Sequence, residues 1–310
     1  MSYLVITNCT GRKSQIPEPK LREIPKLTPQ NDIRACALNW ALSIKTSKRL
    51  YEAENLYQGR SIVDSKAVSD MLNAQSYVVS AGLGLVSAKD LIPSYELTVV
   101  DGSPFRKQLQ KRGHSNQDWW GKLNGALKKT NNPLSKLINS GRYKQIFIAL
   151  PSSYLEMVQK DLWGADRKLL NKVLIFTSTY GAQFIPEEWR QQALPYDERL
   201  EDSKSGYAGT RSDFPQRAMR HFLEKVWIPK DSLESNINKV NQNLKKLQKP
   251  ILPTRRRVDD AEIIRIIKKN WKNKLGNSGA LLRFIRDEAL VSCEQSRFKR
   301  LCAEVRESKR

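Results

Sequence analysis

The sequence predicts an α/β fold with a mostly parallel central sheet flanked by helices, followed by a C-terminal all-helical domain resembling a helix-turn-helix. Three observations lead to this prediction. Four short apolar runs lack the alternation that marks half-exposed strands. Segments with helical spacing separate these runs, and after residue 229 the composition shifts to Lys, Asn and Gln. The chain therefore predicts an α/β core and a separate basic tail.

The four predicted strands are short and apolar, at residues 3–7, 77–81, 145–150 and 173–178. Residues 33–51 place Cys36, Trp40 and Ile44 on one helical face, and residues 119–138 show similar spacing. This order is β-α-β-α-β, which is typical of a parallel sheet.

The segment after residue 229 begins with one narrow apolar seam, formed by Ile237, Val240, Leu244 and Leu247. It indicates a helix that lies on the core or pairs with another helix, and core packing is favoured. Two prolines then prevent regular helix between residues 250 and 257. We therefore expect an α/β domain over 1–229, a basic helical linker over 230–257 and a three-helix DNA-binding domain over 258–310.

The tail shows three helical stretches. Asp259 and Asp260 stand at the start of the first, Gly276 ends it, and Asn277 or Ser278 caps the second. We expect Ser292 to cap the third, with residues 289–292 forming a turn of helix-turn-helix length. That helix would present Gln295, Ser296, Arg297, Lys299 and Arg300 to bases and phosphates. The alternative is a small basic bundle bound to the parent domain.

The charge balance points to a polyanionic partner. The chain has 54 Lys and Arg against 32 Asp and Glu, a formal net charge of +22. Neutralising phosphates releases counterions, so double-stranded DNA is the expected partner. No apolar run approaches the ~18 residues of a membrane span, and the N-terminus has no basic leader, so we expect a cytoplasmic protein without membrane contact.

Cysteine and histidine spacing predicts neither a disulfide framework nor a zinc site. The four cysteines and two histidines are scattered, without CxxC or HxxxH spacing. We therefore expect chemistry without a cofactor and without a metal, and the alternative is a metal held by carboxylates that the sequence does not identify.

Candidate binding residues cluster at the carboxyl ends of the predicted strands, where ligands of open parallel sheets bind. These ends carry Asn, Ser, Thr and Tyr but no His, which suits a base or sugar better than an acyl-transfer triad. Residues 7–14 lack the first glycine of a Walker A loop, so nucleotide hydrolysis is disfavoured. For each hydroxyl, helix capping is the alternative role. The candidates for substrate or DNA contact are Thr10, Arg12, Lys13, Tyr57, Ser80, Gly82, Gly84, Tyr95, Ser152 and Tyr154.

A later polar loop, residues 207–218, leads into a predicted helix with Pro215 in its first turn. Arg211 and Arg217 are candidates to clamp phosphate. Asp213 is a candidate catalytic carboxylate, although capping alone would explain it.

Three motifs resemble those of the YaaA peroxide-stress superfamily. LYQGR at 56–60, SAGLGLV at 80–86 and DLIPSYEL at 90–97 follow that family's "LYxG", "LSGxYGLL" and "DLixPY" in the same order. The resemblance covers roughly residues 1–225, and Leu83 stands where the family usually has tyrosine. It implies an α/β protein with a positively charged, DNA-binding cleft. Relatives in anti-phage defence include a DNA glycosylase that removes glucosylated hydroxymethylcytosine from phage DNA, so base excision from modified phage DNA is implied as well.

We therefore expect a DNA glycosylase that flips a nucleotide, holds its base and stabilises an oxocarbenium-like sugar while water attacks. Asn8 would position the base or water, and Glu96 or Asp101 would be the carboxylate. Tyr57 and Tyr95 would stack, while Arg12 and Lys13 would clamp phosphate. No lysine nucleophile is evident from the sequence, which favours release of an abasic site over strand cleavage.

Two other functions fit the same residues. One is a non-catalytic DNA-binding stress or regulatory protein, in which charge alone acts. The other is a base-exchanging transglycosylase acting on RNA or DNA, which shares the oxocarbenium chemistry but needs a free base.

Overall fold

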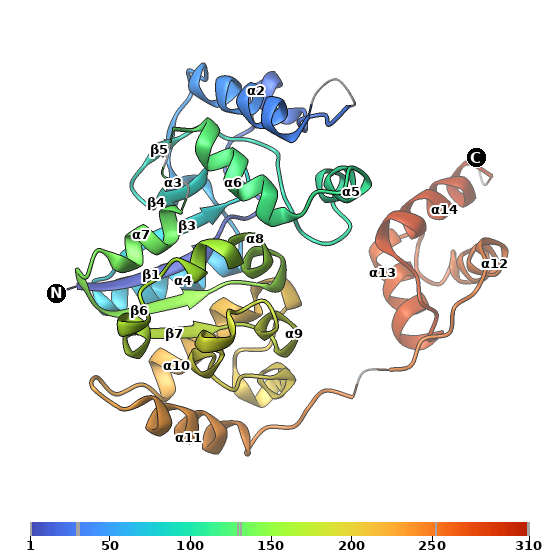
Figure 1. Cartoon of the computed structure of the whole chain (residues 1–310). Helices are drawn as coiled ribbons and strands as arrows, with labels where there is room; N and C mark the ends of the chain where they lie inside the picture. Colours follow the sequence, from blue (N-terminus) through green and yellow to red (C-terminus); the bar gives the residue numbers. More distant parts are fainter. Residues whose placement is uncertain (1, 29–31, 129, 131, 252, 309–310) are drawn as a thin grey trace. The chain divides into compact units, whose positions relative to one another are not determined.

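The chain divides into two compact units, Met1–Lys249 and Pro250–Arg310. The computed structural model describes residues 2–28, 32–128, 130, 132–251 and 253–308, and each unit is considered by itself (Figure 1).

The first unit contains the predicted, mostly parallel sheet flanked by helices. Its five strands run in the order β4-β3-β1-β6-β7, and all pairs are parallel except β3 with β4. The strands are β1 (Ser2–Asn8), β3 (Gln75–Ser80), β4 (Gly84–Ser87), β6 (Tyr143–Ala149) and β7 (Val173–Phe176). A two-stranded antiparallel sheet joins β2 (Tyr51–Glu52) to β5 (Leu91–Ile92). The four predicted strands are thus confirmed, and β4 is added at the sheet edge.

Helices cover both faces of the sheet, because side chains along β1 alternate between two cores. Leu4 and Ile6 belong to one apolar cluster, and Val5 belongs to the other. The first cluster draws on α2 (Ile33–Lys45), α6 (Asn116–Ala126), α7 (Pro133–Asn139) and α8 (Ser152–Trp163); the second draws on α4 (Arg60–Leu72) and α10 (Phe214–Lys225). The shorter helices of the unit are α1 (Pro19–Arg22), α3 (Ala53–Leu56), α5 (Pro104–Lys111) and α9 (Thr179–Ala182).

Both helices predicted in the core are wrong in length. The segment predicted over 33–51 is helical only to Lys45, and Tyr51 begins β2. Residues 119–138 form two helices, α6 and α7, with Pro133 in the first turn of the second. Proline lacks the N–H that a continuous helix would need there, but it is accommodated at a helix start.

The segment after residue 229 packs on the α/β core instead of forming a linker. Helix α11 (Leu233–Leu244) buries Val240 and Leu244 completely in the second apolar cluster, with Ile237 and Leu247 packed against it. The predicted core packing of this seam is therefore confirmed. The division of the chain falls after Lys249, at the start of the non-helical segment 250–257, so residues 230–249 belong to the first unit and not to a linker.

The second unit is helical and has its own apolar cluster. It contains α12 (Asp260–Asn270), α13 (Ser278–Arg283), a π-helical turn at Phe284–Glu288 and α14 (Gln295–Glu307). Ile263, Leu281, Ile285 and Leu301 are among its fully buried residues. As predicted, Asp259 caps α12 and Asn277 caps α13, each accepting from a backbone N–H of the first turn.

The predicted start of the third tail helix at Ser292 is wrong. The Ser292 N–H donates to the carbonyl of Arg256 at 2.8 Å, in a short parallel bridge between Arg256 and Val291. Helix α14 therefore starts at Gln295, and the connection before it is longer than expected.

Truncation tests this division of the chain. A variant ending at Lys249 should keep the unfolding free energy of the first unit, whereas one ending at Pro229 loses the buried Val240 and Leu244. Burying each such side chain contributes about 1.5–3 kcal/mol, so the shorter variant should be destabilised by at least about 3 kcal/mol. Urea unfolding followed by tryptophan fluorescence measures this. Equal unfolding midpoints for the two variants would contradict the assignment of α11 to the first unit.

Candidate active site

The carboxyl ends of β1 and β6 lie side by side, and the chain runs from them to opposite edges of the sheet, to β3 and to β7. The helix that leads into β3, α4, packs in the second apolar cluster, whereas α8, after β6, packs in the first. Such a switch point is where open α/β sheets bind ligands. Here Gln216, on the first turn of α10, reaches the sheet. Its Nε2 donates to Asn8 Oδ1 and to the Ala149 carbonyl, both at 2.8 Å, and to Thr7 Oγ1 at 3.1 Å.

This arrangement holds Asn8 in one orientation. The Asn8 Nδ2 donates to the Cys9 carbonyl at 2.9 Å, so both ends of the amide have a protein partner, and its side chain is buried. Gln216 is fully buried, and its Oε1 accepts no hydrogen bond from any described residue. The switch point thus has one free acceptor beside a fixed amide pair.

A cluster of buried hydroxyls lies at the carboxyl end of β3. The Tyr95 hydroxyl is 2.6 Å from Ser80 Oγ and 3.0 Å from the Tyr57 hydroxyl. Ser80 Oγ also accepts from the backbone N–H groups of Gly82 and Leu83. Burial raises the pKa of both phenols, so they act as neutral hydrogen-bonding groups.

The glycine motif at 82–84 leaves room for the Tyr95 ring. A Cβ on Gly82 would lie 2.6 Å from the Tyr95 ring, so no larger residue fits without moving that ring. Gly84 begins β4 at a φ of +70°, a conformation that glycine adopts without strain. Gly82 therefore leaves room for the Tyr95 ring, and Gly84 allows the turn into β4. The close approach of this backbone to a ligand stays a prediction.

Lys13 lies over this cluster. Its Nζ is 4.2 Å from the centroid of the Tyr95 ring, 5.7 Å from that of Tyr57, and 3.1 Å from the Thr10 carbonyl oxygen. A short antiparallel bridge between Lys13 and Tyr57 fixes the loop. Burial lowers the pKa of Lys13, partly offset by the nearby Cys9 and Glu96. The side chain is half-buried, and it does not extend into solvent as a phosphate clamp would.

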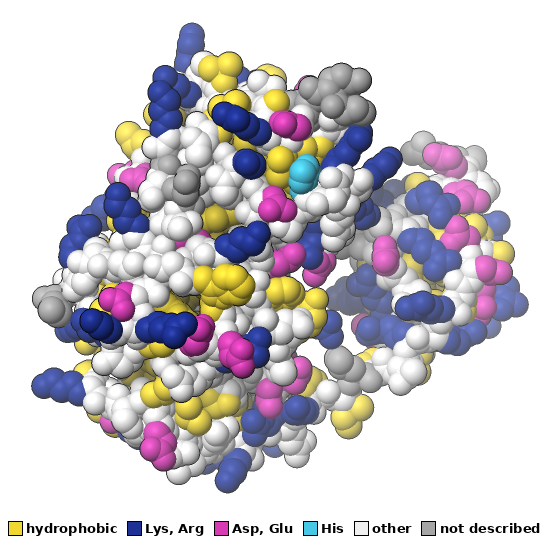
Figure 2. Space-filling model, in the orientation of Figure 1, with side chains coloured by type: hydrophobic (Ala, Val, Ile, Leu, Met, Phe, Trp, Pro, Cys, Tyr) yellow, Lys and Arg dark blue, Asp and Glu magenta, His cyan; other side chains and the backbone are white. Residues whose placement is uncertain are grey.

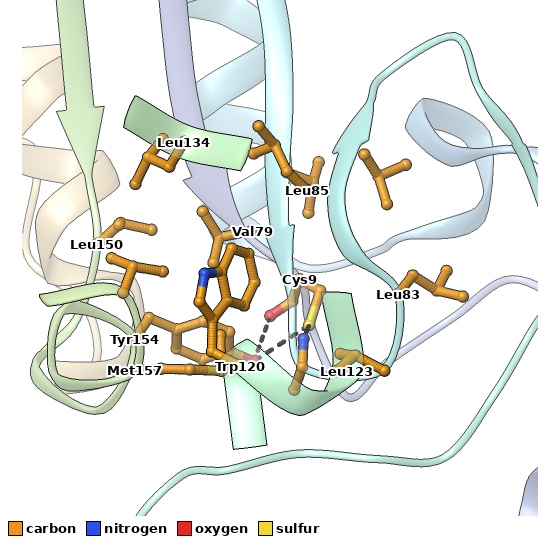
Figure 3. Packing of buried hydrophobic residues seen from close by; sticks show 14 of the residues in the cluster. Cys9, Val79, Leu83, Leu85, Trp120, Leu123, Leu134, Leu150, Tyr154 and Met157 are labelled. Atoms are coloured by element: carbon orange, nitrogen blue, oxygen red, sulfur yellow. Dashed lines mark hydrogen bonds between the residues drawn. The ribbon is translucent and has the colours of Figure 1, made fainter. Parts of the chain in front are cut away.

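Tyr154 points inward from the first turn of α8 and contacts the end of β1. Its hydroxyl donates to the Cys9 carbonyl at 3.2 Å and lies 3.1 Å from Cys9 Sγ (Figure 3). Burial raises the pKa of Tyr154, so this phenol too stays neutral. Ser152, at the start of the same helix, is half-buried.

The two carboxylates expected to be catalytic lie at the surface. Glu96 is exposed, with its backbone N–H bound to the Leu21 carbonyl. Asp101 is exposed as well, and its carboxylate pairs with Arg106 at 3.1 Å. Of the two, Glu96 is the one that acts electrostatically on Lys13.

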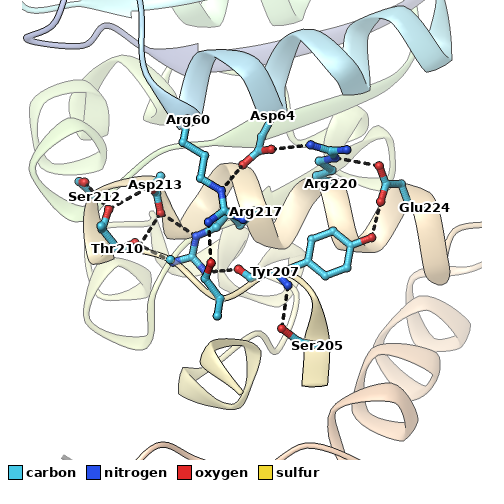
Figure 4. Close-up of polar contacts among 12 residues, drawn as sticks. Arg60, Asp64, Ser205, Tyr207, Thr210, Ser212, Asp213, Arg217, Arg220 and Glu224 are labelled. Carbon is cyan, nitrogen blue, oxygen red and sulfur yellow. Dashed lines mark hydrogen bonds and ion pairs between the residues drawn. The ribbon is translucent and has the colours of Figure 1, made fainter. Parts of the chain in front are cut away.

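Asp213 and Arg217 form a buried ion pair (Figure 4). Arg217 is fully buried, and its guanidinium donates to Asp213 at 2.6 Å, to Glu201 at 2.7 Å and to the carbonyls of Tyr207 and Thr210, each at 2.6 Å. This placement favours a structural role over contact with phosphate or a reacting sugar. Arg211, by contrast, is exposed.

The remaining candidates lie at the surface. Thr10 and Arg12 belong to the loop after β1, where the Thr10 hydroxyl donates to the Arg12 carbonyl and the Arg12 side chain is exposed. Gln295, Lys299 and Arg300 are exposed on α14, where Arg300 pairs with Asp260 at 2.6 Å.

A polar groove of about 960 Å³ borders the same region from the α4 side of the sheet. It reaches Thr7 and Tyr57, and hydroxyls line much of it, from Ser65, Ser69, Ser76 and Ser87. Because Ser65 Oγ donates to Thr7 Oγ1, the groove is connected by hydrogen bonds to the switch point. The sequence did not indicate it.

One further residue at the carboxyl edge, Gln216, was missed, and Pro215 in a first helical turn was the only local signal near it. Tyr180, at the start of α9, belongs to the last of the four strand ends whose hydroxyls and tyrosines the sequence indicated. It has 62% of its surface exposed, and its ring lies edge-on to Phe184.

A scan of protein-family models and searches of curated proteins and of solved structures find no match to this chain. Among the described residues, no helix is long and apolar enough to cross a membrane, and no three His, Cys, Asp or Glu side chains are grouped to hold a metal ion.

Paired substitutions of Arg217 and Arg211 separate structural from binding roles. Arg217→Ala would leave Glu201 and Asp213 without their partner, and breaking a buried pair destabilises by about 3–5 kcal/mol. Arg211→Ala should leave the free energy of unfolding within about 0.5 kcal/mol of wild type, as surface substitutions usually do. Urea unfolding of the two variants measures both values. A stable Arg217→Ala protein that binds DNA less well would restore the phosphate-clamp role.

Proposed function

We propose that this protein binds double-stranded DNA and excises a modified base from it, leaving an abasic site. The observation that carries the proposal is that Asn8 ends β1 while Ser80, Tyr95 and Lys13 meet at the end of the neighbouring strand β3. A neutral amide and hydroxyls beside one cation suit a nucleotide flipped out of a duplex. The net charge of +22 supports DNA as the polymer that brings it there.

Asn8 would read the base edge, and Gln216 would hold its amide in one orientation. Because Gln216 is fully buried and both ends of the Asn8 amide have protein partners, the base would have to replace one partner of Asn8, such as the Cys9 carbonyl. A base that cannot make this hydrogen bond would leave the Asn8 amide unpaired, which costs free energy and gives selectivity. The rings of Tyr57 and Tyr95 are buried, and Lys13 covers Tyr95. We therefore assign the stacking role to the exposed Tyr180 in place of these two rings.

Glu96 is our first candidate for the carboxylate that stabilises the oxocarbenium-like sugar or activates water. It is exposed at the surface and acts on Lys13 electrostatically. Asp101 on the same segment is the alternative, and Asp213 is less suited because Arg217 holds it.

One observation favours a non-catalytic DNA-binding protein as the second candidate. Both carboxylates on that segment are exposed, so neither lies in the dry surroundings that strengthen transition-state electrostatics. In that case the protein would bind DNA through its positive charge and catalyse no reaction. Figure 2 shows Lys and Arg spread over the visible face of the first unit, with acidic side chains among them.

The second unit is proposed as the DNA-scanning module. Helix α14 exposes Gln295 and Lys299 while it buries Phe298 and Leu301, so polar side chains are available on it as on a recognition helix. A basic helical bundle that only contacts phosphate is the alternative.

Single-turnover base release tests the proposed activity. Glu96→Gln should lower the rate of release by about 10²-fold or more while leaving DNA affinity nearly unchanged, because the carboxylate acts mainly in the transition state. Asp101→Asn tests the alternative carboxylate on the same segment, and a loss of rate there but not in Glu96→Gln would assign the role to Asp101. Asn8→Ala should erode discrimination as well as rate. The substrates are duplexes with glucosylated, hydroxymethylated or plain cytosine, with uracil and alkylated bases as further controls. If no base is released from any of these duplexes, the non-catalytic DNA-binding function is favoured over the glycosylase.

Removing the second unit tests its role in binding. Residues 251–310 carry 16 Lys and Arg against 8 Asp and Glu. A chain ending at Lys249 should bind duplex DNA more weakly, and the dependence of its affinity on salt should be less steep because fewer counterions are released. Fluorescence anisotropy over a series of salt concentrations gives the slope. An unchanged slope would mean that the second unit makes no phosphate contacts.

A further inference from the structure

Lys13 has the surroundings of a nucleophilic amine. Its ammonium has one hydrogen bond, to the Thr10 carbonyl, and no described carboxylate lies within 4 Å of it. The Tyr95 and Tyr57 rings lie under it, and Cys9 and Glu96 act on it electrostatically. A phosphate clamp would instead keep its ammonium in water, where it is strongly hydrated.

The phenols under Lys13 hold its side chain in place but carry no negative charge, so none of them forms an ion pair with the amine. The Tyr57, Tyr95 and Tyr154 phenols are kept neutral by burial. The partial burial that lowers the pKa of Lys13 also increases the share of free amine at neutral pH. Desolvated lysines of this kind form Schiff bases with carbonyl groups.

The carboxyl edge of the sheet is also where the sugar of a flipped nucleotide would lie. Lys13 belongs to the loop directly after β1, five residues beyond Asn8, and its Nζ stands over Tyr95 at the end of the β3 motif. An abasic sugar carries an aldehyde at C1′ when its ring is open. The amine and the aldehyde would therefore meet at the same edge.

We infer that Lys13 attacks C1′ of an abasic site and cleaves the DNA strand on its 3′ side. This step rests on the proposed function, since base excision would supply the abasic site. The amine nitrogen forms an imine with C1′ and the carbonyl oxygen leaves as water. Loss of the C2′ proton to water then drives cleavage of the C3′–O bond, and the 3′ phosphate leaves with the bonding electrons. Hydrolysis of the imine frees Lys13 and an unsaturated aldehyde.

Borohydride trapping on a preformed abasic site tests this step apart from base excision. A uracil-containing duplex is treated with a uracil-DNA glycosylase, the full-length protein is added, and borohydride reduces any imine to a stable amine. Wild type should be cross-linked, and peptide mapping should place the DNA adduct on Lys13.

Substitution completes the test. Lys13→Arg keeps a cation over the Tyr95 ring but removes the primary amine, so cross-linking and strand cleavage should each fall at least about 10-fold. Lys107→Arg, an exposed lysine on α5, is the matched control and should change neither. Thermal unfolding of Lys13→Arg checks that the fold is kept.

The outcomes separate the two proposals. Cleavage of preformed abasic sites without base release from modified duplexes would support the Lys13 step and overturn the glycosylase. Three results would overturn the Lys13 step itself: no cross-link with wild type, an adduct on the N-terminal amine or another lysine, or full activity of Lys13→Arg. Base release without strand cleavage would likewise leave the glycosylase standing and remove the Lys13 step.

Discussion

The candidate site depends on the first turn of α10, where one residue binds the sheet and the next binds the loop that precedes the helix. Gln216 reaches the sheet and joins the ends of β1 and β6 through Asn8 and Ala149. Arg217, the next residue, is buried against Glu201 and Asp213 in the loop that precedes the helix. An uncompensated arginine at this depth would be very costly, so the loop and the helix position each other. A shift of α10 along the sheet would break both sets of contacts at once.

This constraint limits the chemistry that the site can perform. The tyrosines at the strand ends are buried and neutral, so they can donate or accept hydrogen bonds but cannot serve as general bases near neutral pH. The groups left for reaction lie at the edge of the cluster, with Lys13 half-buried and Glu96 exposed. The buried tyrosines thus form the neutral inner part of the candidate site, and the two groups proposed to react lie nearer the surface.

The fold was largely predictable from the sequence, because its signals are local. Four buried strands are continuous apolar runs, and Asp259 and Asn277 cap helices within three residues of themselves. Strand β4 was not predictable, because it has four residues and begins with a glycine. The start of α14 depends on a bridge to Arg256, about forty residues before it, which no local pattern shows.

The site was predictable in its location but less so in its roles. Strand ends identified Asn8, Ser80 and Tyr95, which the structure does bring together with Lys13 or Gln216. Arg217 was expected to bind phosphate because an arginine after a polar loop is usually exposed, yet Glu201 compensates it from sixteen residues away. The contacts of the Gln216 amide, and the position of the Lys13 side chain over the Tyr95 ring, are tertiary as well, so the local sequence does not predict them.

The distribution of charge over the two units bears on how DNA would be held. The second unit has an excess of cations, but most of the net charge of +22 belongs to the first. Each unit alone would then bind phosphate weakly and reversibly, and a tether through Pro250 and Pro253 would make the second contact an intramolecular one. Joined weak contacts let a protein move along a duplex while staying bound, and the proposed excision of rare bases would require such movement. The same charge on a single rigid surface would hold the DNA more firmly at each site and slow that search.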